Sequence, residues 1–580
     1  MTRPISELSR RRLSELALFS GMDGAALNDL MAEFSLLSLP GGDMLFAHGD
    51  APEALYVVLN GGLGVYRPED GREALIGRVG VGEVVGEMAL IADRPRMGTV
   101  RALRDSELLK LSRQAFDALV RTHPRSLLRM ARGLIARLEQ AAREHRGAPH
   151  TVAVLALHEG LDAQRFAEDL GKALAVGCSV RVLDADRDAA EPTAWFSALE
   201  GEHRFVLYPA GPRIDDWREF SLRQADLVLF LARAGFEGRA LATPPRSRDR
   251  PRHLVLLQDD TVLPGAAARW QGLADVDRHH HVRGGADIAR LARLIARRGL
   301  GLVLSGGGAR GFAHVGMIRA LREAGFAIDA IGGTSLGAIV AAGVAMGWDD
   351  DELAVRFRRS FVEGNPLGDY TFPFVALTRG SRVSARLRRE FGDTDIEDLL
   401  LPYFCVSTSL SAGATRVHDQ GRLWRWLRAS CAIPGLLPPV LHEGELLVDG
   451  GVIDNLPVHP MLGFDPGRVL GCEVAGHFSL KAGWNETELP PLWRMIVQWY
   501  SGKRRNDIGR ILLRAGMVNS ELAAGQNRTL CDVMLRPPVD SVDLLGWRAF
   551  DKVVELGYRH AAEAIDKGEL DGLRETGCPA

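Results

Sequence analysis

The chain has 580 residues, of which 46% are hydrophobic and 25% are charged, so it is long enough for two to four folded domains and too apolar to be disordered throughout. Its 71 basic and 74 acidic residues nearly cancel, which argues against a protein built mainly to bind nucleic acid. No nucleic acid polymer is therefore expected among its partners.

The six cysteines are scattered, with no pair at the spacing of a metal site or a redox motif, and this favours a reduced compartment. The basic residues at 10–12 precede a short apolar stretch as in a secretory signal, but Ser14 and Glu15 interrupt that stretch. No window approaches the roughly 20 uncharged apolar residues that span a bilayer. We therefore expect a cytoplasmic protein that can still make peripheral contact with the inner face of the membrane.

The first domain, expected over residues 15–140, has the pattern of a β-roll with flanking helices. A helical pattern over residues 16–31 is followed by short alternating segments between glycine and aspartate turns, of which 55–66 is an example. Many short strands between turns predict a small β-barrel or jelly roll. Residues 124–146 then form an arginine-rich helical pattern, and no helix suited to reading DNA follows it.

The distinctive piece of this domain is residues 86–99, GEMALIADRPRMGT, in which a glycine turn opens a short helical turn and an arginine follows. Free N–H groups at a helix start favour an anion, and an arginine fork suits phosphate oxygens. The segment resembles the phosphate-binding cassette of cyclic-nucleotide-binding domains. That resemblance implies a cyclic-nucleotide site at Gly86, Glu87 and Arg96. In it, Glu87 holds the ribose hydroxyl and Arg96 the cyclic phosphate, with cAMP or cGMP as the effector.

The cassette departs from the family at Met97, where a small residue is usual beside the arginine. The alternative is a roll without a ligand, in which Glu87 and Arg96 pair with each other or with solvent.

Residues 150–298 predict a second, α/β domain, because apolar strands alternate with helical stretches as in a parallel sheet covered on both faces. The pair Gly171–Lys172 is not preceded by a glycine-rich loop of P-loop form, so a structural role is favoured over nucleotide binding. The adjacent residues His279, His280 and His281 cannot all face one point. We expect them to pack or lie at the surface, and we expect no metal site.

The third domain, expected over residues 300–465, begins with strand, glycine-rich turn, helix, strand, sharp turn and helix over residues 301–347. Its first turn, GGGARG at 306–311, satisfies the dinucleotide-binding fingerprint, but Asp329 precedes the second strand, whereas a ribose-binding carboxylate belongs at that strand's end. Exposed N–H groups at such a turn can instead stabilise an oxyanion. Since neighbouring parallel strands end at one sheet edge, both turns should face one cleft.

The second turn, GTSLG, fits a serine held on a strained bend between a strand and a helix, with Gly333 and Gly337 where a Cβ would not fit. Ser335 is therefore a candidate nucleophile, and a serine needs a base to accept its proton. Much later, an apolar strand ends in Asp449, followed by two glycines. This carboxylate is a candidate base, although Asp-Gly-Gly is also common in ordinary turns.

Together, GGGARG, GTSLG and DGG in this order resemble the patatin-like phospholipase family. The segments ASCAIPG at 429–435 and DNLP at 454–457 are similar to bacterial relatives of neuropathy target esterase, a family that also joins cyclic-nucleotide-binding rolls to a patatin domain. The resemblance covers nearly the whole chain. It implies a patatin-like α/β hydrolase domain completed by a helical C-terminal extension over residues 466–580.

The same resemblance implies a catalytic dyad of Ser335 and Asp449 without a histidine. It places the oxyanion hole around Gly306, Gly307, Gly308 and Arg310. A carboxylate that serves as a direct base should be desolvated, which predicts a raised pKa at Asp449. A triad would instead need one of the nearby histidines, which are His314, His418, His442 and His459.

The sequence thus predicts a serine hydrolase acting on carboxylic esters of lipids, a phospholipase or lysophospholipase that requires no cofactor for catalysis. The alternative is a catalytically inactive regulatory or lipid-binding protein that responds to a cyclic nucleotide. Tryptophans beside basic residues at 489–505 and at 422–428 suit a membrane surface, or equally a helix packed on the core. Acyl chain, head group, positional preference, the nucleotide and the oligomeric state stay open.

Overall fold

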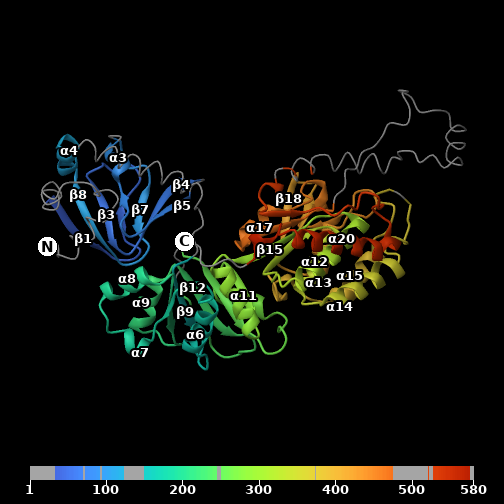
Figure 1. Cartoon of the computed structure of the whole chain (residues 1–580), viewed down its shortest axis with the longest axis horizontal. Coiled ribbons are helices and arrows are strands. Elements are labelled where there is room, and N and C mark those ends of the chain that lie inside the picture. The colour runs from blue at the N-terminus through green and yellow to red at the C-terminus, as the bar shows by residue number, and fades with distance from the viewer. Residues whose placement is uncertain are drawn as a thin grey trace, which may run out of the picture. The chain divides into compact units, whose positions relative to one another are not determined.

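The computed structural model describes residues 33–69, 72–91, 94–122, 149–244, 250–372, 374–474, 520, 525 and 527–574 (Figure 1). The helices expected at 16–31 and 124–146 and the segment 489–505 lie outside them. The chain forms two compact units, one of residues 1–232, 237–255 and 273–278, the other of residues 233–236, 256–272 and 279–580.

The N-terminal domain is a roll of two four-stranded antiparallel sheets, in the orders β1-β8-β3-β6 and β2-β7-β4-β5. Its core lies between the sheets, where Val58 of one packs with Leu63 and Val100 of the other. The predicted β-roll is therefore confirmed. Its elements are β1 (Phe34–Leu39), β2 (Met44–Phe46), β3 (Ala54–Asn60), β4 (Leu63–Glu69), β5 (Arg72–Val79), β6 (Val84–Val85), α3 (Glu87–Ile91), β7 (Thr99–Ala102), β8 (Ser106–Ser112) and α4 (Arg113–Thr122).

The middle domain has a six-stranded sheet in the order β10-β11-β9-β12-β13-β14, with parallel pairing of β9 to β11 and β12. Helix α6 begins at an aspartate cap, where Asp162 accepts a hydrogen bond from the N–H of Arg165. This carboxylate occupies the helix start where a P-loop would hold a phosphate, which supports the expected structural role. The elements are β9 (Thr151–Ala156), α6 (Ala163–Leu174), β10 (Val180–Val182), α7 (Ala185–Asp188), α8 (Thr193–Glu202), β11 (Phe205–Ala210), α9 (Asp216–Gln224), β12 (Leu227–Arg233), β13 (Arg252–Leu257), α10 (Ala266–Leu273), β14 (Arg278–Val282) and α11 (Gly285–Ile295).

The three consecutive histidines lie on β14 and serve packing. The Nε2 atoms of His279 and His281 lie 2.7 and 2.8 Å from the carbonyl oxygen of Glu397, and His280 is buried. Within the described ranges, no group of three or more metal-binding side chains occurs.

The hydrolase-like domain has an eight-stranded sheet in the order β19-β20-β17-β16-β15-β21-β22, with β18 paired to β17. Strands β15, β16, β17 and β21 run parallel, whereas β18 and β20 run antiparallel to β17. The strands are β15 (Gly299–Leu304), β16 (Ala330–Thr334), β17 (Tyr403–Ser409), β18 (Ala414–His418), β19 (Val440–His442), β20 (Glu445–Asp449), β21 (Gly467–Cys472) and β22 (Val533–Leu535).

Helices cover both faces of this sheet because its central strands are apolar on both sides. Leu302 and Leu304 of β15 pack with α12 and α13, whereas Val303 between them packs with α17. Every residue of α13 is buried, which explains its run of small and aliphatic side chains. The helices are α12 (Ala313–Glu323), α13 (Leu336–Ala345), α14 (Asp350–Phe357), α15 (Ser381–Phe391), α16 (Leu423–Ser430), α17 (Val458–Phe464) and α20 (Phe550–Asp566).

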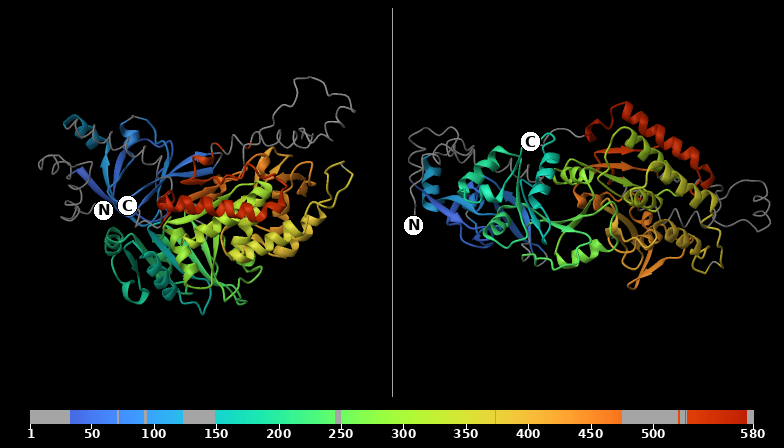
Figure 2. Two further views of the ribbon diagram at one scale, coloured as in Figure 1. Left: turned by 45° about the vertical axis from the view of Figure 1, so that its right-hand side comes forward. Right: turned by 90° about the horizontal axis from the view of Figure 1, so that it is seen from below.

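Helix α20, from the C-terminal part of the chain, packs directly on α12, which follows the glycine-rich turn (Figure 2). The two backbones approach so closely that a Cβ at Gly316 would contact the carbonyl of Val554, and one at Gly557 the carbonyl of Ala313. Glycine is required at both positions for lack of space. Helix α20 is thereby part of the core around α12.

Four cysteines, Cys405, Cys431, Cys472 and Cys531, carry free thiols, but Cys178 is disulfide-bonded. The spacing of the cysteines did not predict this bond, since spacing along a chain does not fix which sulfurs meet in space. In the described part of the chain, every helix is too short or too polar to cross a membrane.

Candidate active site

Ser335 lies on the sharp turn between β16 and α13, with a backbone φ of 54°. A positive φ is strained for a residue with a Cβ and is kept only where the surrounding structure enforces it. Gly333 and Gly337 allow that turn, because a Cβ at either would contact the carbonyl oxygen of Leu304 on the neighbouring strand. The serine side chain is thus presented at the carboxyl edge of the parallel sheet.

The hydroxyl of Ser335 donates a 2.7 Å hydrogen bond to Oδ2 of Asp449, although 114 residues separate them. Strand register explains the meeting. Thr334 is paired with Val406, so the next residue, Ser335, is level with Ser407, and Ser407 is paired with Asp449 on β20. The pair is therefore built by three adjacent strands.

Burial raises the pKa of Asp449 to about 6, and hydrogen bonds from the Ser335 hydroxyl and the Gly451 N–H oppose that rise. Both side chains of the pair are largely shielded from water, with 7% of each residue exposed. A carboxylate whose charge is poorly solvated accepts a proton more readily than one in water. The environment therefore makes Asp449 a stronger base than a surface aspartate.

None of the four candidate histidines takes part in this pair. The Nε2 of His314 lies 2.9 Å from the carbonyl oxygen of Ser305, and burial lowers its pKa to about 4. His418 bonds to Ser407, His442 packs edge-on against Trp426, and His459 is exposed. Among the described residues, no histidine hydrogen-bonds to Ser335 or Asp449.

The glycine-rich turn has most of its N–H groups occupied. The N–H of Gly306 donates to the carbonyl of Asn455, and that of Arg310 to the carbonyl of Gly307, both at 3.2 Å. The N–H groups of Gly307 and Gly308 have no acceptor in the described parts of the chain. The four residues expected around the oxyanion hole thus reduce to two available amides.

The side chain of Arg310 points away from the serine. Its Nε donates to the carbonyl of Val542 at 2.8 Å and its Nη2 to that of Asp540 at 3.2 Å. Arg310 therefore fastens the glycine-rich turn to the C-terminal part of the chain.

Two further side chains support the site, and the sequence did not single them out by role. One binds the nucleophile's backbone and the other binds the glycine-rich turn. The hydroxyl of Ser430 accepts a 2.9 Å hydrogen bond from the N–H of Ser335, and the N–H of Asp449 donates to the carbonyl of Ala432. Asn455 donates from Nδ2 to the carbonyl of Gly306. Both side chains lie in the segments 429–435 and 454–457, so the only signal for them was resemblance to relatives.

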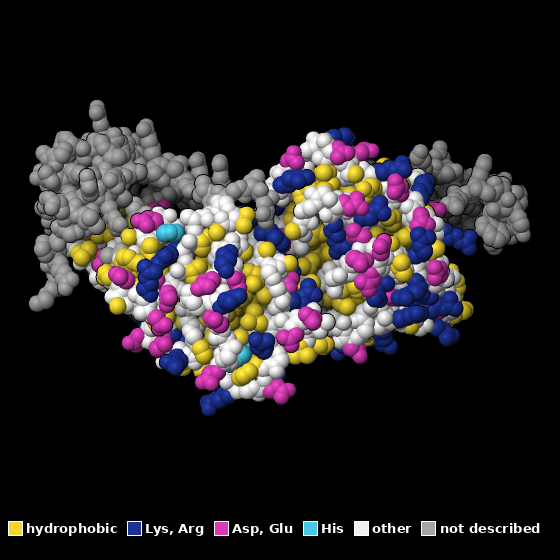
Figure 3. All heavy atoms as spheres, turned by 60° about the horizontal axis from the view of Figure 1, so that its bottom comes forward, with side chains coloured by type: hydrophobic (Ala, Val, Ile, Leu, Met, Phe, Trp, Pro, Cys, Tyr) yellow, Lys and Arg dark blue, Asp and Glu magenta, His cyan; other side chains and the backbone are white. Residues whose placement is uncertain are grey.

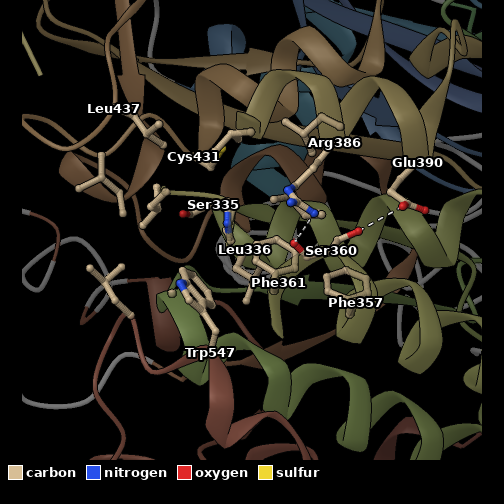
Figure 4. A pocket seen from close by; sticks show the side chains of 18 of the residues that line it. Ser335, Leu336, Phe357, Ser360, Phe361, Arg386, Glu390, Cys431, Leu437 and Trp547 are labelled. Carbon is tan, nitrogen blue, oxygen red and sulfur yellow. Dashed lines mark hydrogen bonds between the residues drawn. The ribbon is translucent and has the colours of Figure 1, made fainter. Parts of the chain in front are cut away.

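An apolar pocket opens directly beside the nucleophile, with Ser335 and Gly308 in its wall and about 800 Å³ of space, open solvent included (Figure 4). Its polar side chains bond to one another: Arg386 donates to the carbonyl of Ser360, and the Ser360 hydroxyl donates to Glu390. Such a pocket suits a hydrocarbon chain bound next to the reacting carbonyl. Its apolar lining comes from Leu336, Ile339, Trp348, Phe357, Phe361, Pro366, Leu367, Val383, Leu387, Phe391, Ile433, Leu436, Leu437, Leu545 and Trp547.

In the N-terminal roll, the expected phosphate ligand Arg96 is buried and turned toward the protein. Its guanidinium donates to the carbonyls of Gly86 at 2.7 Å and Ala54 at 2.5 Å and lies over the ring of Phe46. Burial lowers the pKa of Arg96. Glu87 is also buried, and its charge opposes the lowering of the Arg96 pKa.

Three segments of the chain match known protein families. Residues 302–462 match patatin-like phospholipase, residues 36–123 match the cyclic nucleotide-binding domain, and residues 149–290 match the P-loop like domain of the neuropathy target esterase family. The fold is thus a roll of the cyclic-nucleotide-binding type followed by an α/β domain and a patatin-like α/β domain.

Curated relatives align along most of the chain. Patatin-like phospholipase domain-containing protein 7 of Rattus norvegicus is 28% identical over 93% of this chain and 46% of its own length. Lysophospholipase NTE1 of Cryptococcus neoformans var. neoformans is 30% identical over 93% of this chain and 39% of its own length. The chain spans less than half the length of these relatives.

Replacing Ser430 with alanine should slow the reaction of Ser335 with a fluorophosphonate about tenfold, because the Ser335 amide loses its acceptor and the strained turn loses a restraint. The measurement is the second-order labelling rate of the folded variant. Ser221→Ala, which removes another fully buried hydroxyl far along the chain, is the matched control and should label at the wild-type rate. Equal rates for Ser430→Ala and wild type would contradict the positioning role.

Proposed function

We propose that this protein is a serine hydrolase that cleaves carboxylic ester bonds of lipids, as a lysophospholipase or phospholipase. The observation that carries the proposal is the hydrogen bond between Ser335 Oγ and Asp449 Oδ2 at the wall of an apolar pocket. The match to patatin-like phospholipase and the names of the relatives support the same class of reaction.

The proposed reaction uses a dyad. Asp449 takes the proton of Ser335 as Oγ attacks the ester carbonyl, and the N–H groups of Gly307 and Gly308 stabilise the negative charge on the carbonyl oxygen. The C–O bond to the alcohol then breaks, and the alcohol oxygen takes the proton from Asp449. An acyl-enzyme remains on Ser335.

Hydrolysis of the acyl-enzyme repeats these steps with water. Asp449 takes a proton from the water molecule as it attacks the acyl carbon, and returns that proton to Ser335 Oγ when the acyl bond breaks. The products are a fatty acid and the alcohol part of the lipid. Every proton moves through one carboxylate, so the reaction needs neither a histidine nor a cofactor.

Replacing Ser335 with alanine should abolish hydrolysis of a panel of lysophospholipids and phospholipids, by about a thousandfold or more, because the hydroxyl that Asp449 activates is removed. The released fatty acid is the measured quantity. Asp449→Asn should lose activity to a similar degree, since an amide cannot accept the proton. Retained turnover in Asp449→Asn would exclude the dyad, and failure of folded wild type to label with a fluorophosphonate would favour the inactive, regulatory alternative.

The loss in Asp449→Asn should not come from unfolding. The pKa of Asp449 is raised from its ordinary value of 3.8 to about 6 in the folded chain. Protonation of Asp449 therefore stabilises the folded state, and this contribution to the free energy of unfolding is lost as the pH rises through about 6. The neutral asparagine avoids that loss. Its melting temperature at pH 8 should therefore be no lower than that of wild type.

The rate constant kcat/KM should fall about tenfold per pH unit below pH 6, because burial raises the pKa of Asp449 to about 6 and the protonated base cannot accept the serine proton. The measurement is a pH profile with an uncharged ester. Burial also raises the pKa of Asp454 to about 6, so Asp454→Asn is the control and should keep the acid limb. A flat profile down to pH 4.5, or loss of the limb in Asp454→Asn, would contradict the assignment.

We also propose that the N-terminal roll binds cAMP or cGMP as an effector. The family match over residues 36–123 supports it, as does the buried position of Glu87 and Arg96 at the cassette. Binding would require the Arg96 fork to exchange its two carbonyl acceptors for phosphate oxygens. The nucleotide would therefore change the contacts of Gly86 and Ala54, which gives the roll a means of responding to it.

Calorimetric titration of the full chain should show heat with cAMP or cGMP, and at least about tenfold weaker binding after Arg96→Lys, because lysine cannot form the two-pronged contact. Arg94→Lys, an exposed arginine two residues away, is the matched control and should bind like wild type. No heat with either nucleotide would favour a roll that has lost its ligand.

Peripheral contact with the inner face of the membrane, in a cytoplasmic protein, is part of the proposal because phospholipid substrates reside in bilayers. The resemblance of this sequence to the bacterial relatives of neuropathy target esterase also remains a prediction.

A further inference from the structure

A short hairpin of the hydrolase domain carries an unusual set of exposed hydrophobic side chains. This hairpin, of which the structure describes residues 370–372 and 374–378, is called the aromatic finger. Phe374 is 87% exposed, and Tyr370, Phe372 and Val375 are each about 70% exposed. Single apolar residues are common on protein surfaces, but a contiguous group of large ones marks an interaction site.

The exposure of the aromatic finger is built into the fold. Tyr370 and Thr378 form an antiparallel bridge, the N–H of Thr371 donates to the carbonyl of Leu377, and the N–H of Arg379 donates to the carbonyl of Asp369. The rings of Phe372 and Phe374 lie 4.8 Å apart at their centroids. The hairpin therefore holds its aromatic side chains together away from the domain core.

The aromatic finger is fastened to the wall of the substrate pocket. The N–H groups of Leu377 and Thr378 donate to the carbonyls of Gly435 and Leu436. Leu436 lines the pocket that contains Ser335, and so do Leu367 before the finger and Val383 after it. A surface that received the finger would lie next to the pocket in which the ester is cleaved.

Arginines follow the aromatic finger along the chain, and the Asp369 carboxylate at its base accepts from the Ser381 hydroxyl and the Arg382 N–H. The exposed arginines are Arg379, directly after the finger, and Arg382, Arg388 and Arg389 on α15, and no carboxylate among the described residues forms an ion pair with them. Glu390 of the same helix is already bonded to Arg356 and Arg359.

Figure 3 shows Lys and Arg side chains gathered on the right-hand side of the described surface, with Asp and Glu side chains nearby, on the side where α14 and α15 lie in Figure 1. Exposed aromatic side chains with arginines beside them match the interface of an anionic bilayer.

We propose that the aromatic finger is the element with which this protein docks on a bilayer that contains anionic phospholipid. Phe372 and Phe374 enter the acyl boundary, and Arg379 and Arg382 bind the head groups. Docking then places the mouth of the Ser335 pocket at the lipid surface. The inference rests on the proposed function in one respect, which is that the substrate is a membrane lipid.

The docking test uses the full chain with Ser335→Ala, so that vesicles are not consumed, and measures cosedimentation with phosphatidylcholine vesicles with and without phosphatidylglycerol. The parent should bind the anionic vesicles. Phe372→Ser with Phe374→Ser should weaken binding to them at least about tenfold, because two rings no longer leave water. Arg379→Gln with Arg382→Gln should remove most of the dependence on phosphatidylglycerol and on low salt.

Leu441→Ser with Leu446→Ser is the matched control. These two leucines are exposed and face each other across the β19–β20 hairpin of the same domain. The control should bind vesicles like the parent. No vesicle binding by the parent, unchanged binding after loss of both phenylalanines, or equal loss in the control would each overturn the proposal.

A second measurement separates docking from catalysis. With Ser335 present, the double phenylalanine variant should hydrolyse a short-chain, water-soluble ester at the wild-type rate but lose most activity on phospholipid in anionic vesicles. If wild type cleaves the soluble ester while its Ser335→Ala form binds no vesicles, the hydrolase stands and docking fails. A self-association that the phenylalanine changes abolish, without any effect on vesicles, would assign the finger to a second copy and also overturn the proposal.

Discussion

The hydrogen bond between the hydroxyl of Ser335 and the carboxylate of Asp449 is the interaction on which the rest of this domain depends. It requires a serine in a strained backbone conformation and a carboxylate without water, and both are costly. The surrounding structure offsets those costs with close backbone packing at Gly333 and Gly337 and with hydrogen bonds from Gly451 and to Ser430. The backbone strain and the desolvation cost are therefore both located at the two residues that carry the proposed chemistry.

Long-range contacts hold the elements of the site in one geometry. The segment around Ser430 and Ala432 binds the backbone of both members of the pair. The glycine-rich turn is held from one side by Asn455 and from the other by the carbonyls of Val542 and Leu544 in the C-terminal part. Residues 540–544 therefore support the glycine-rich turn, although they lie outside the segment 302–462 that matches patatin-like phospholipase.

The apolar pocket lies beside the nucleophile, and the aromatic finger is bonded to the wall of that pocket. Leu367, Val383 and Leu436 connect the two, since they line the pocket and either flank the finger along the chain or accept one of its backbone hydrogen bonds. A lipid substrate has to leave an apolar bilayer and enter an apolar pocket, and a continuous hydrophobic path removes most of the cost of crossing water. Substrate access and catalysis are thus parts of one surface in the proposed function.

The sequence by itself determined the order of domains, the β-roll and the parallel α/β core, because strand periodicity and glycine turns are local features, whereas the pairing of Ser335 with Asp449 was predicted only through the resemblance to patatin-like phospholipases. Tertiary structure alone decided which amides of 306–310 are free, that Arg310 faces the C-terminal part, that Arg96 binds carbonyls, and that Cys178 is disulfide-bonded. It also placed Ser430 behind the nucleophile and exposed the aromatic finger. These outcomes depend on contacts between residues far apart along the chain, and local pattern carries no record of such contacts.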